Sequence, residues 1–519
     1  GNHDIADLTY RFGGTKGELD YRITASTLND DGMDSANQFD HPDDTNSNNI
    51  DYRLDYQLDH KNTISYQGGY GNNKQQTDRN HIDVLPLQRT VDNTQLFQFI
   101  KWENSIDTEN TLQLQYYYNL SDKEDRYLSD EISDPALGFI PFELHVNGDI
   151  KTERHNLELT HFMQPNEQLK LVLGAGAQFD FVQSSLFLGT DEKITHEQYR
   201  TFANIEYQIN HRNTVNLGAL LEKNNFSDTA LSPRVSLTHT FNRHHKIRLG
   251  ISQAIRSPFV FEALGSQTYR QELTGGVLDG LTLRENVIGS TEYRSEDLEN
   301  EKITSREIVY LGEFINSSLH FNARLFHDNL SNYIDTIRET DTIAEPDEVL
   351  FDNEVLVFRN PIDSSTTGLE LELDYYINPS LRLIASGAIV NINSNSDAIS
   401  QSAPQHSYSL LASKRFNEKY NGSLGYYFVD SFKWTDATPR PLPTGVATTE
   451  ETNISTEKYQ ALDLRASRNF VTNKTKGSLS IVLKNLLDDY SDYQAAPRGD
   501  SSPIVIQNTL WYIDFRLNF

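Results

Sequence analysis

Oxygen-bearing side chains crowd one short stretch of the sequence, DDTNSNN. Carboxylate and amide oxygens are the ligands that Ca²⁺ prefers, and calcium loops place them at alternate positions. The spacing of Asp44, Asn46 and Asn48 resembles such a loop, with Asp43 as a further oxygen ligand. Asn49 stands where these loops need a glycine for their sharp turn. The stretch therefore predicts a loop calcium site, with an acidic solvated loop as the simpler alternative.

A second group of residues combines arginine with aromatic side chains. Aromatic rings bury a large area at little entropic cost, and arginine pairs with carboxylates or catecholates. Both types are enriched where binding surfaces make their strongest contacts. The sequence therefore predicts a ligand-recognising surface that includes Arg256, Phe259, Phe261, Tyr269, Arg270, Trp434 and Arg440. The alternative is that residues 255–265 are a structural loop root.

No catalytic motif is present. The sequence has no G-x-S-x-G, no H-E-x-x-H and no glycine-rich phosphate loop. It has no cysteine, which excludes disulfides and thiolate metal sites. Asp463 and Arg465 could form an acid–base pair, and His244 and His245 are adjacent, but solvated or hydrogen-bonded side chains are the simpler interpretation of both pairs. We therefore expect a protein that is not an enzyme and requires no cofactor.

Strands must position these residues. Strand side chains alternate between two faces. In the last residues of the chain, one face is apolar: Trp511, Ile513, Phe515, Leu517 and Phe519. The other face carries Tyr512, Asp514, Arg516 and Asn518. The same alternation recurs at 19–25, 52–58, 112–118, 169–177, 319–325, 369–375 and 479–483. One polar face throughout, with no helical stretch between the strands, predicts a large closed antiparallel sheet with a polar interior.

The connections between these strands alternate in length. Ten short turns, the first at 13–17 and the last at 472–476, alternate with longer polar connections. The longest of these lie near 28–48, 121–147, 256–301, 336–354, 432–457 and 486–506. This plan predicts about 21 strands over residues 1–519, in an all-β transmembrane barrel with its short turns in the periplasm. The odd count predicts one further strand ahead of Gly1, hence about 22, a size at which the lumen holds a plug.

Composition excludes several other classes of protein. A soluble chain of 519 residues would need several domains, yet no linker rich in Pro, Gly or Ser divides it. No eighteen consecutive apolar residues could form a transmembrane helix. The net charge of −29 argues against nucleic acid as a partner. A soluble β-propeller, the remaining alternative, would need a repeat of about 40–50 residues, and none is visible.

Several segments resemble motifs of the TonB-dependent outer-membrane receptors. In chain order they are IRSPFVFEALG (255–265), SEDLENEKITSREIVYLGEF (295–314), TTGLELELDYYINPSLRL (366–383), APQHSYSL (403–410), LDLRASRNF (462–470) and VLKNLLDDYSDY (482–493). The N-L-x-D-x-x-Y pattern of the last segment is the most specific. Glu299 departs from the family pattern, because a proline usually stands there.

This resemblance implies a receptor barrel in the outer membrane of a Gram-negative bacterium. It also implies an N-terminal plug domain in the lumen and a short box that contacts the TonB complex. Neither is present in the sequence, and we expect both, with a signal peptide, ahead of Gly1. The implied partners are the plug, TonB, lipopolysaccharide and outer-membrane lipid, and a small-molecule ligand.

The function expected from the resemblance is TonB-dependent uptake of a scarce nutrient, with a ferric siderophore favoured. The arginines and aromatic residues of the outer loops would then recognise an iron chelate. Relatives also carry haem, cobalamin or glycans, and the loop sequences do not choose among these ligands. A passive porin-like channel is the alternative from another class, and a steady open pore in the full-length protein would support it.

Overall fold

The structure is a computed structural model of residues 1–519. It describes residues 5–32, 44–77, 89–129, 143–274, 279–286, 288–289, 298–340, 347–350, 354–436, 452–472, 475–487, 490–492, 505–507 and 509–518.

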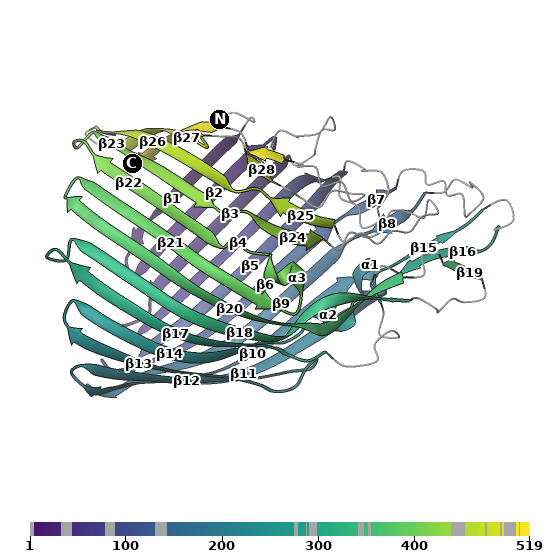
Figure 1. Ribbon diagram of the computed structural model, residues 1–519, viewed down its shortest axis with the longest axis horizontal. Helices are drawn as coiled ribbons and strands as arrows, with labels where there is room; N and C mark the ends of the chain where they lie inside the picture. The colour runs from purple at the N-terminus through teal and green to yellow at the C-terminus, as the bar shows by residue number, and fades with distance from the viewer. Residues whose placement is uncertain are drawn as a thin grey trace.

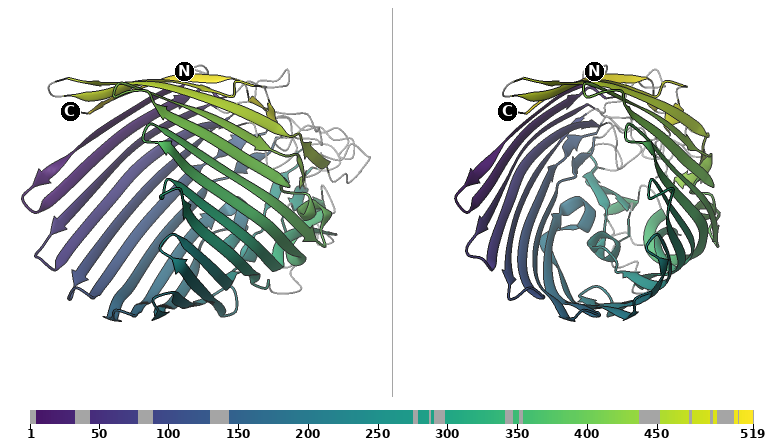
Figure 2. Two further views of the ribbon diagram at one scale, coloured as in Figure 1. Left: turned by 60° about the vertical axis from the view of Figure 1, so that its left-hand side comes forward. Right: turned by 90° about the vertical axis from the view of Figure 1, so that its left-hand side faces the viewer.

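One antiparallel sheet of 21 strands makes up most of the molecule, which confirms the predicted fold class and strand count. Each strand pairs with the strand of this sheet that precedes it in the sequence and with the one that follows it. The sheet curls around a central lumen (Figures 1 and 2). Its strands are β1 (Ala6–Lys16), β2 (Leu19–Asp30), β3 (Thr45–Gln57), β4 (Asn62–Thr77), β5 (Arg89–Ser105), β6 (Asn110–Glu124), β9 (Ile150–Asn166), β10 (Leu169–Ser184), β11 (Thr190–Asn210), β12 (Asn213–Asn224), β13 (Ala230–Asn242), β14 (His245–Arg256), β17 (Glu301–Phe314), β18 (Leu319–Thr340), β20 (Glu354–Asn378), β21 (Leu381–Ser394), β22 (His406–Arg415), β23 (Tyr420–Val429), β26 (Tyr459–Val471), β27 (Lys476–Lys484) and β30 (Leu510–Asn518).

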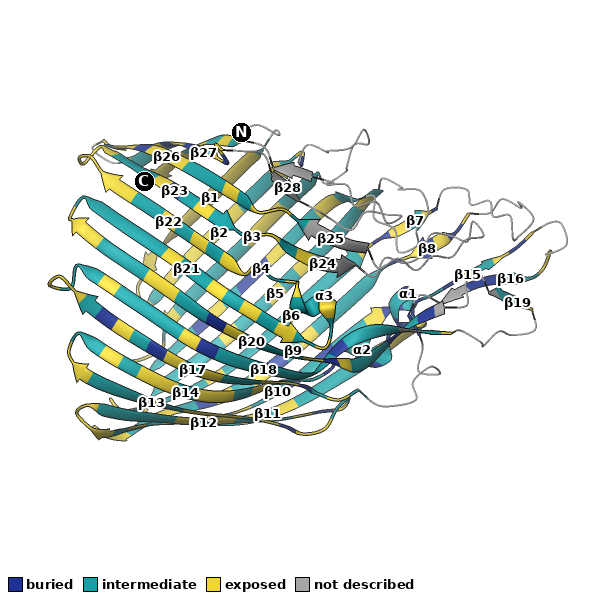
Figure 3. Cartoon of the chain, viewed as in Figure 1, coloured by how far each residue is buried: buried dark blue, intermediate teal, exposed yellow. Residues whose placement is uncertain are grey.

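Period-two alternation places the apolar side chains of each strand on one face of the sheet, where they stay exposed. Residues directly opposite each other in an antiparallel pair point to the same side. Ile513 lies opposite Ile481, and Phe515 lies opposite Leu479, so these apolar side chains share one face. All four are at least 43% exposed, as are many apolar side chains on the other strands. Figure 3 shows exposed residues recurring along the strands of the wall. Such a surface is stable where lipid, not water, covers it.

The short turns are stabilised by Asp and Asn side chains that bond to the backbone two residues ahead. Asp59 Oδ1 accepts hydrogen bonds from the backbone N–H groups of Lys61 (2.7 Å) and Asn62 (2.9 Å). These donors, that of Lys61 first, hold the pKa of Asp59 below its usual range. The same contact occurs in the turns that begin at Asp107, Asn166, Asn210, Asn242, Asn378 and Asn417. The turn residues that marked the short rim in the sequence therefore form it.

The first and last strands of the sheet run in the same direction. Because 21 strands alternate, β1 and β30 both run toward the short turns. β1 pairs with β2 and β30 pairs with β27, and no ladder joins β1 to β30 among the described residues. The further strand that the sequence predicts ahead of Gly1 stays a prediction.

The long connections carry small elements at the opposite rim. They are β7 (Arg126–Leu128), β8 (His145–Asn147), α1 (Ser185–Leu188), α2 (Val260–Leu264), β15 (Thr268–Glu272), β16 (Thr282–Asn286), β19 (Glu348–Leu350), α3 (Asp397–Ser400), β24 (Phe432–Asp436), β25 (Thr452–Thr456), β28 (Tyr490–Asp492) and β29 (Val505–Gln507). None of the helices in the described residues has the length and hydrophobicity of a transmembrane helix.

Several of these connections share a small hydrophobic core of their own, which we call the loop core. It consists of Leu144, Val146, Leu186, Tyr269, Leu273 and Leu283, with Tyr127, Phe187 and Val349 packed against it. Four connections that are far apart in the sequence thus meet at one side of the barrel mouth (Figure 1).

Two connections are shorter than the sequence predicted. β18 and β20 continue pairing past the wall as far as Thr340 and Glu354, with register shifts near Asn332, whose φ is +59°. β3 begins at Thr45, inside the connection expected over 28–48. Backbone pairing extends these strands through polar residues. Alternation of apolar residues, on which the predicted strand ends were based, does not reach that far.

Candidate functional site

Charged side chains pair across neighbouring strands on the inner face of the wall. Arg324 of β18 donates hydrogen bonds to Glu307 of β17 (2.9 Å) and to Glu370 of β20 (3.1 Å). Arg248 of β14 donates to the other oxygen of Glu307 (3.0 Å). Charge-assisted bonds of this kind hold side chains in fixed positions. The inner wall therefore presents an ordered pattern of charge to whatever occupies the lumen.

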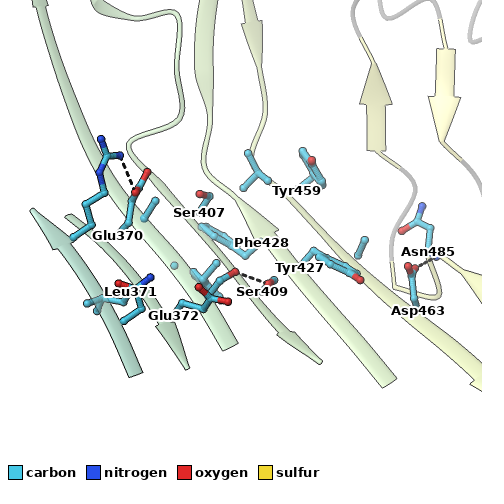
Figure 4. Close-up of a pocket in the computed structure, with 18 of the residues that line it drawn as sticks. Glu370, Leu371, Glu372, Ser407, Ser409, Tyr427, Phe428, Tyr459, Asp463 and Asn485 are labelled. Carbon is cyan, nitrogen blue, oxygen red and sulfur yellow. Dashed lines mark hydrogen bonds and ion pairs between the residues drawn. The ribbon is translucent and has the colours of Figure 1, made fainter. Parts of the chain in front are cut away.

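This network borders a hollow of about 840 Å³ on the inner wall. Figure 4 shows Glu370, Ser409 and Asp463 around it, together with the rings of Tyr427 and Tyr459. Asp463 accepts a hydrogen bond from the backbone N–H of Asn485 (3.0 Å). Carboxylates, hydroxyls and rings in this arrangement can bind a polar molecule or a polar protein surface.

A second hollow, of about 1000 Å³, is lined by residues 255–261 together with parts of β5, β6 and β9 to β12. Arg154 donates to both carboxylate oxygens of Asp180, at 2.6 and 2.8 Å. Gln178 Nε2 donates to Asp180 at 2.9 Å, and His196 Nδ1 lies 3.4 Å from the same oxygen. Asp180 is thus fully engaged, so the cluster is suited to shaping the wall and not to exchanging protons with a substrate.

Arg154, Asp180 and His196 carry no pattern in the sequence that marks them as a group. None of the three lies in a stretch where the sequence showed clear alternation. The contacts among them depend on the register of β9, β10 and β11, which sets Arg154 opposite Asp180 and Asp180 opposite His196. That register follows from strand pairing and is not legible in one strand alone.

Three of the predicted ligand-recognising residues lie together beside the second hollow: Arg256, Phe259 and Phe261. Arg256 bonds to Glu301 (2.5 Å) and to Glu262 (2.8 and 3.0 Å). Its guanidinium also lies 4.6 Å from the ring centre of Phe259, which is 63% exposed. The arginine is therefore an anchor for the loop root, while the ring of Phe259 is the accessible part of the group.

Two further residues of the predicted surface, Tyr269 and Arg270, do not line the second hollow. Tyr269 is only 5% exposed in the loop core, and Arg270 beside it is an exposed partner of Glu348 at 3.4 Å. Trp434 lies in β24, opposite Ile454 of β25. Arg440 lies outside the described residues. Ligand contact by any of these seven residues stays a prediction.

Of the four predicted calcium ligands, two lie within a strand and one lies just before it. Asn46 and Asn48 belong to β3, where Asn48 donates to Asn46 (2.8 Å) and Asn46 donates to Asn29 of β2. Asp44 precedes the strand, and Asp43 lies outside the described residues. Among the described residues, no three His, Asp or Glu side chains come together as a metal site. Calcium binding by this stretch stays a prediction.

The members of the Asp463–Arg465 and His244–His245 pairs bond to separate partners. Arg465 donates to Ser480 Oγ (3.0 Å), whereas Asp463 accepts from the backbone of Asn485. His244 Nδ1 lies 3.1 Å from Glu313 in a short turn, and His245 Nδ1 lies 2.8 Å from the hydroxyl of Tyr310.

Comparison with known proteins agrees with this architecture. The model of one protein family, described as TonB dependent receptor-like, beta-barrel, matches residues 1–486. No curated protein sequence matches the chain.

Solved structures of low sequence identity share the fold. A ferric enterobactin receptor, PfeA, from Pseudomonas aeruginosa is 11% identical, with a TM-score of 0.72 over 100% of this chain and 78% of that chain. The siderophore receptor PirA from Acinetobacter baumannii is 12% identical, with a TM-score of 0.71 over 99% and 78%. The copper transporter OprC is 14% identical, with a TM-score of 0.69 over 100% and 78%.

Proposed function

The chain belongs to the β-barrel family of the TonB-dependent receptors, and from that premise we propose that it forms the wall of a transporter for TonB-driven uptake of a ferric siderophore. Proteins of this family are receptors of the Gram-negative outer membrane, and the chain lies in that membrane. The proposal rests on the family match over residues 1–486. The sheet agrees with it, because its outer face is apolar and its inner face is charged.

The inner wall supports a role in gated transport. Arg248, Glu307, Arg324 and Glu370 form a fixed pattern of charge, and such a pattern suits contact with a polar plug domain. A plug that packs against these charged side chains would close the lumen until the TonB complex acts on it. The plug and the TonB contact are part of the proposal.

The choice of ligand has two supports. PfeA and PirA are named as ferric enterobactin and siderophore receptors. The exposed ring of Phe259 sits beside a hollow of about 1000 Å³, which suits a bulky chelate. OprC is named as a copper transporter, so copper is a ligand that the test must include.

Uptake by the complete protein, as its gene encodes it, tests the proposal. The protein is produced in a strain without its own siderophore receptors, with and without TonB, and offered radioactive iron on catecholate, hydroxamate and carboxylate siderophores. We expect saturable accumulation of one chelate that disappears without TonB. TonB-dependent uptake of haem, cobalamin, a glycan or copper instead would overturn the iron assignment alone. Flux that is unsaturable and independent of TonB would indicate a passive channel and overturn the whole proposal.

The predicted recognition surface is tested in the same assay. We expect Phe259→Ala to raise the KM for the chelate severalfold while leaving the amount of folded protein unchanged, because its ring is exposed beside the hollow. Arg270→Ala, Trp434→Ala and Arg440→Ala test the remaining predicted residues. Uptake unaffected by all four substitutions would remove these positions from the ligand site.

A further inference from the structure

Six exposed basic side chains gather at the short-turn end of the barrel, over one part of its circumference. They are Arg212, Arg243, Lys246, Arg415, Lys419 and Lys476, and we call them the basic rim. Arg212, Arg243 and Lys419 lie in the turns that join β11 to β12, β13 to β14 and β22 to β23. The other three lie at the ends of β14, β22 and β27 that meet such turns. All of these turns lie at one end of the barrel (Figure 1).

The basic rim differs in charge from the short turns of the first strands. The four short turns between β1 and β10 contain one lysine, Lys61, and five carboxylates: Glu18, Asp59, Asp107, Glu109 and Glu167. By contrast, the turns at 211–212 and 243–244 contain no carboxylate, and the turn at 416–419 contains one, Glu418. The short-turn end of the barrel is therefore acidic on one side and basic on the other.

Carboxylates of the protein do not neutralise the basic rim. Among the described residues, none of its six side chains forms an ion pair with Asp or Glu. Arg243 donates to His244 Nε2 (2.7 Å), and Arg415 donates to the backbone carbonyl of Pro379 (3.2 Å). Glu313, near the end of β17, lies 3.1 Å from His244 Nδ1 instead. In a chain of net charge −29, such a patch favours an anionic partner from outside the chain.

The side chains of the basic rim face water and not hydrocarbon. Alternation puts its three strand-end cations on the lumen side, because each lies an even number of residues from a side chain that lines the hollow of about 840 Å³. The pairs are Lys246 with Arg248, Arg415 with Ser409, and Lys476 with Lys484. The cations on the lipid-facing side here pack on rings: Lys414 lies 5.5 Å from the ring centre of Phe416, and Arg468 lies 5.9 Å from that of Tyr420. The basic rim is therefore open to a partner in the periplasm.

We propose that the basic rim docks on peptidoglycan, the anionic polymer that lies beneath the outer membrane. The peptide side chains of this polymer carry free carboxylates at regular intervals, and the short turns of an outer-membrane barrel face it. Neighbouring turns lie two strands apart, about 10 Å at the usual strand spacing. Cations spread along an arc in this way suit a repeating polyanion, which can make several weak contacts at once. A single small anion would instead need donors that converge on one point.

Sedimentation of the purified full-length protein with isolated sacculi tests this contact without reference to transport. Sacculi are sheets of peptidoglycan from which all protein has been removed. The readout is the fraction of the protein in the pellet over a series of peptidoglycan concentrations. One variant combines Arg212→Gln, Arg243→Gln and Lys246→Gln, and a second combines Arg415→Gln, Lys419→Gln and Lys476→Gln.

The matched control removes three cations from the opposite rim. It combines Lys74→Gln, Lys151→Gln and Lys193→Gln, whose partners are Asp92 (3.6 Å), Asp122 (3.5 Å) and Glu153 (3.3 Å). The control therefore changes the net charge as much as each triple variant does, but on the side of the membrane that peptidoglycan does not reach.

We expect each triple variant to weaken binding severalfold and their combination to weaken it roughly tenfold or more. The control should bind as the unaltered protein does, and each variant must show the same folded fraction by circular dichroism. Binding should also fall as salt rises, because screening weakens contacts between exposed charges. Sacculi whose carboxylates have been converted to amides should lose the difference between the variants and the unaltered protein.

Three results would overturn the proposal. The first is equal binding to sacculi by the unaltered protein and all variants. The second is loss of binding when phosphatidylglycerol is added to the detergent micelles, which would show that lipid of the inner leaflet covers the basic rim. The third is competition by polyglutamate at a far lower carboxylate concentration than that of peptidoglycan, which would show that an acidic polypeptide is the partner.

Discussion

The guanidinium of Arg256 donates two hydrogen bonds of 2.5 Å to the carboxylate of Glu301, from Nε and Nη2. Arg256 ends β14 and Glu301 begins β17, so one bidentate contact closes the connection between them. The same guanidinium holds Glu262, which in turn accepts a bond from the backbone N–H of Phe259 (2.8 Å). Arg256 therefore ties the loop root to the barrel rim.

We expect Arg256→Ala to lower the free energy of unfolding by about 1–3 kcal/mol, because it leaves Glu301, 6% exposed, without its cation. Thermal unfolding in detergent measures the loss, and limited proteolysis within 257–300 reports release of the loop root. Arg270→Ala is the control: its side chain is 57% exposed, so loss of its contact with Glu348 should cost less than about 1 kcal/mol. Equal effects of the two variants would contradict the anchor.

The loop core should open independently of the barrel. Leu273 is 1% exposed, and truncating it to alanine should cost about 2–4 kcal/mol of local stability. Hydrogen exchange should then rise in β15 and β16 while the barrel strands stay protected. Leu128→Ala, at a position 38% exposed on β7, should change exchange little. Faster exchange throughout the barrel in the Leu273 variant would show that the loop core is not a separate unit.

One short turn contains a conformation that its residue disfavours. Ile315, Asn316 and Ser317 all have positive φ, 53°, 54° and 63°. A β-branched residue in this region is an outlier, and the left-handed conformation costs roughly 1–2 kcal/mol. We expect Ile315→Asn to raise the free energy of unfolding by about 1 kcal/mol, measured by denaturant titration in detergent. Ile377→Asn, at an exposed position without positive φ, should give no gain; a similar gain there would refute the backbone explanation.

Charge on the two faces of β30 should have opposite consequences. Ile513 is 59% exposed on the apolar face, whereas Tyr512 lies on the other side. Ile513→Lys should cost about 2–4 kcal/mol in a bilayer, because it places an ammonium group in hydrocarbon. Tyr512→Lys should cost less than about 1 kcal/mol, since a lumen-facing charge stays hydrated. Refolding into lipid vesicles at graded urea measures both, and equal costs would contradict the assignment of the faces.

The sequence determined the wall of this barrel more completely than its rim. The alternation from Leu369 to Tyr375 predicts which side chains of that strand face lipid. Asn or Asp residues such as Asn210 and Asp59 predict where the short turns lie. These signals are local, so they can be recognised in a single strand or turn.

The candidate site depends on contacts between distant segments, which leave no local signal. Tyr269 resembles a surface aromatic in sequence, yet it is buried in the loop core. Arg256 resembles a ligand-binding arginine, yet Glu301, forty-five residues later, holds it. Residue type identified these positions as important, but only the packing of the long connections distinguishes an anchor from a contact surface.

Accessibility of single cysteines along β30 tests the central claim most directly, namely that alternate side chains of this sheet meet lipid while their neighbours enclose a lumen. The chain contains no cysteine, so each position from 511 to 518 can be altered alone, labelled with bimane and examined in vesicles of brominated lipid. We predict strong quenching at 511, 513, 515 and 517 and weak quenching at the positions between them. Uniform quenching, or equal labelling of all positions by a water-soluble maleimide in plain buffer, would contradict the barrel and the transport function built on it.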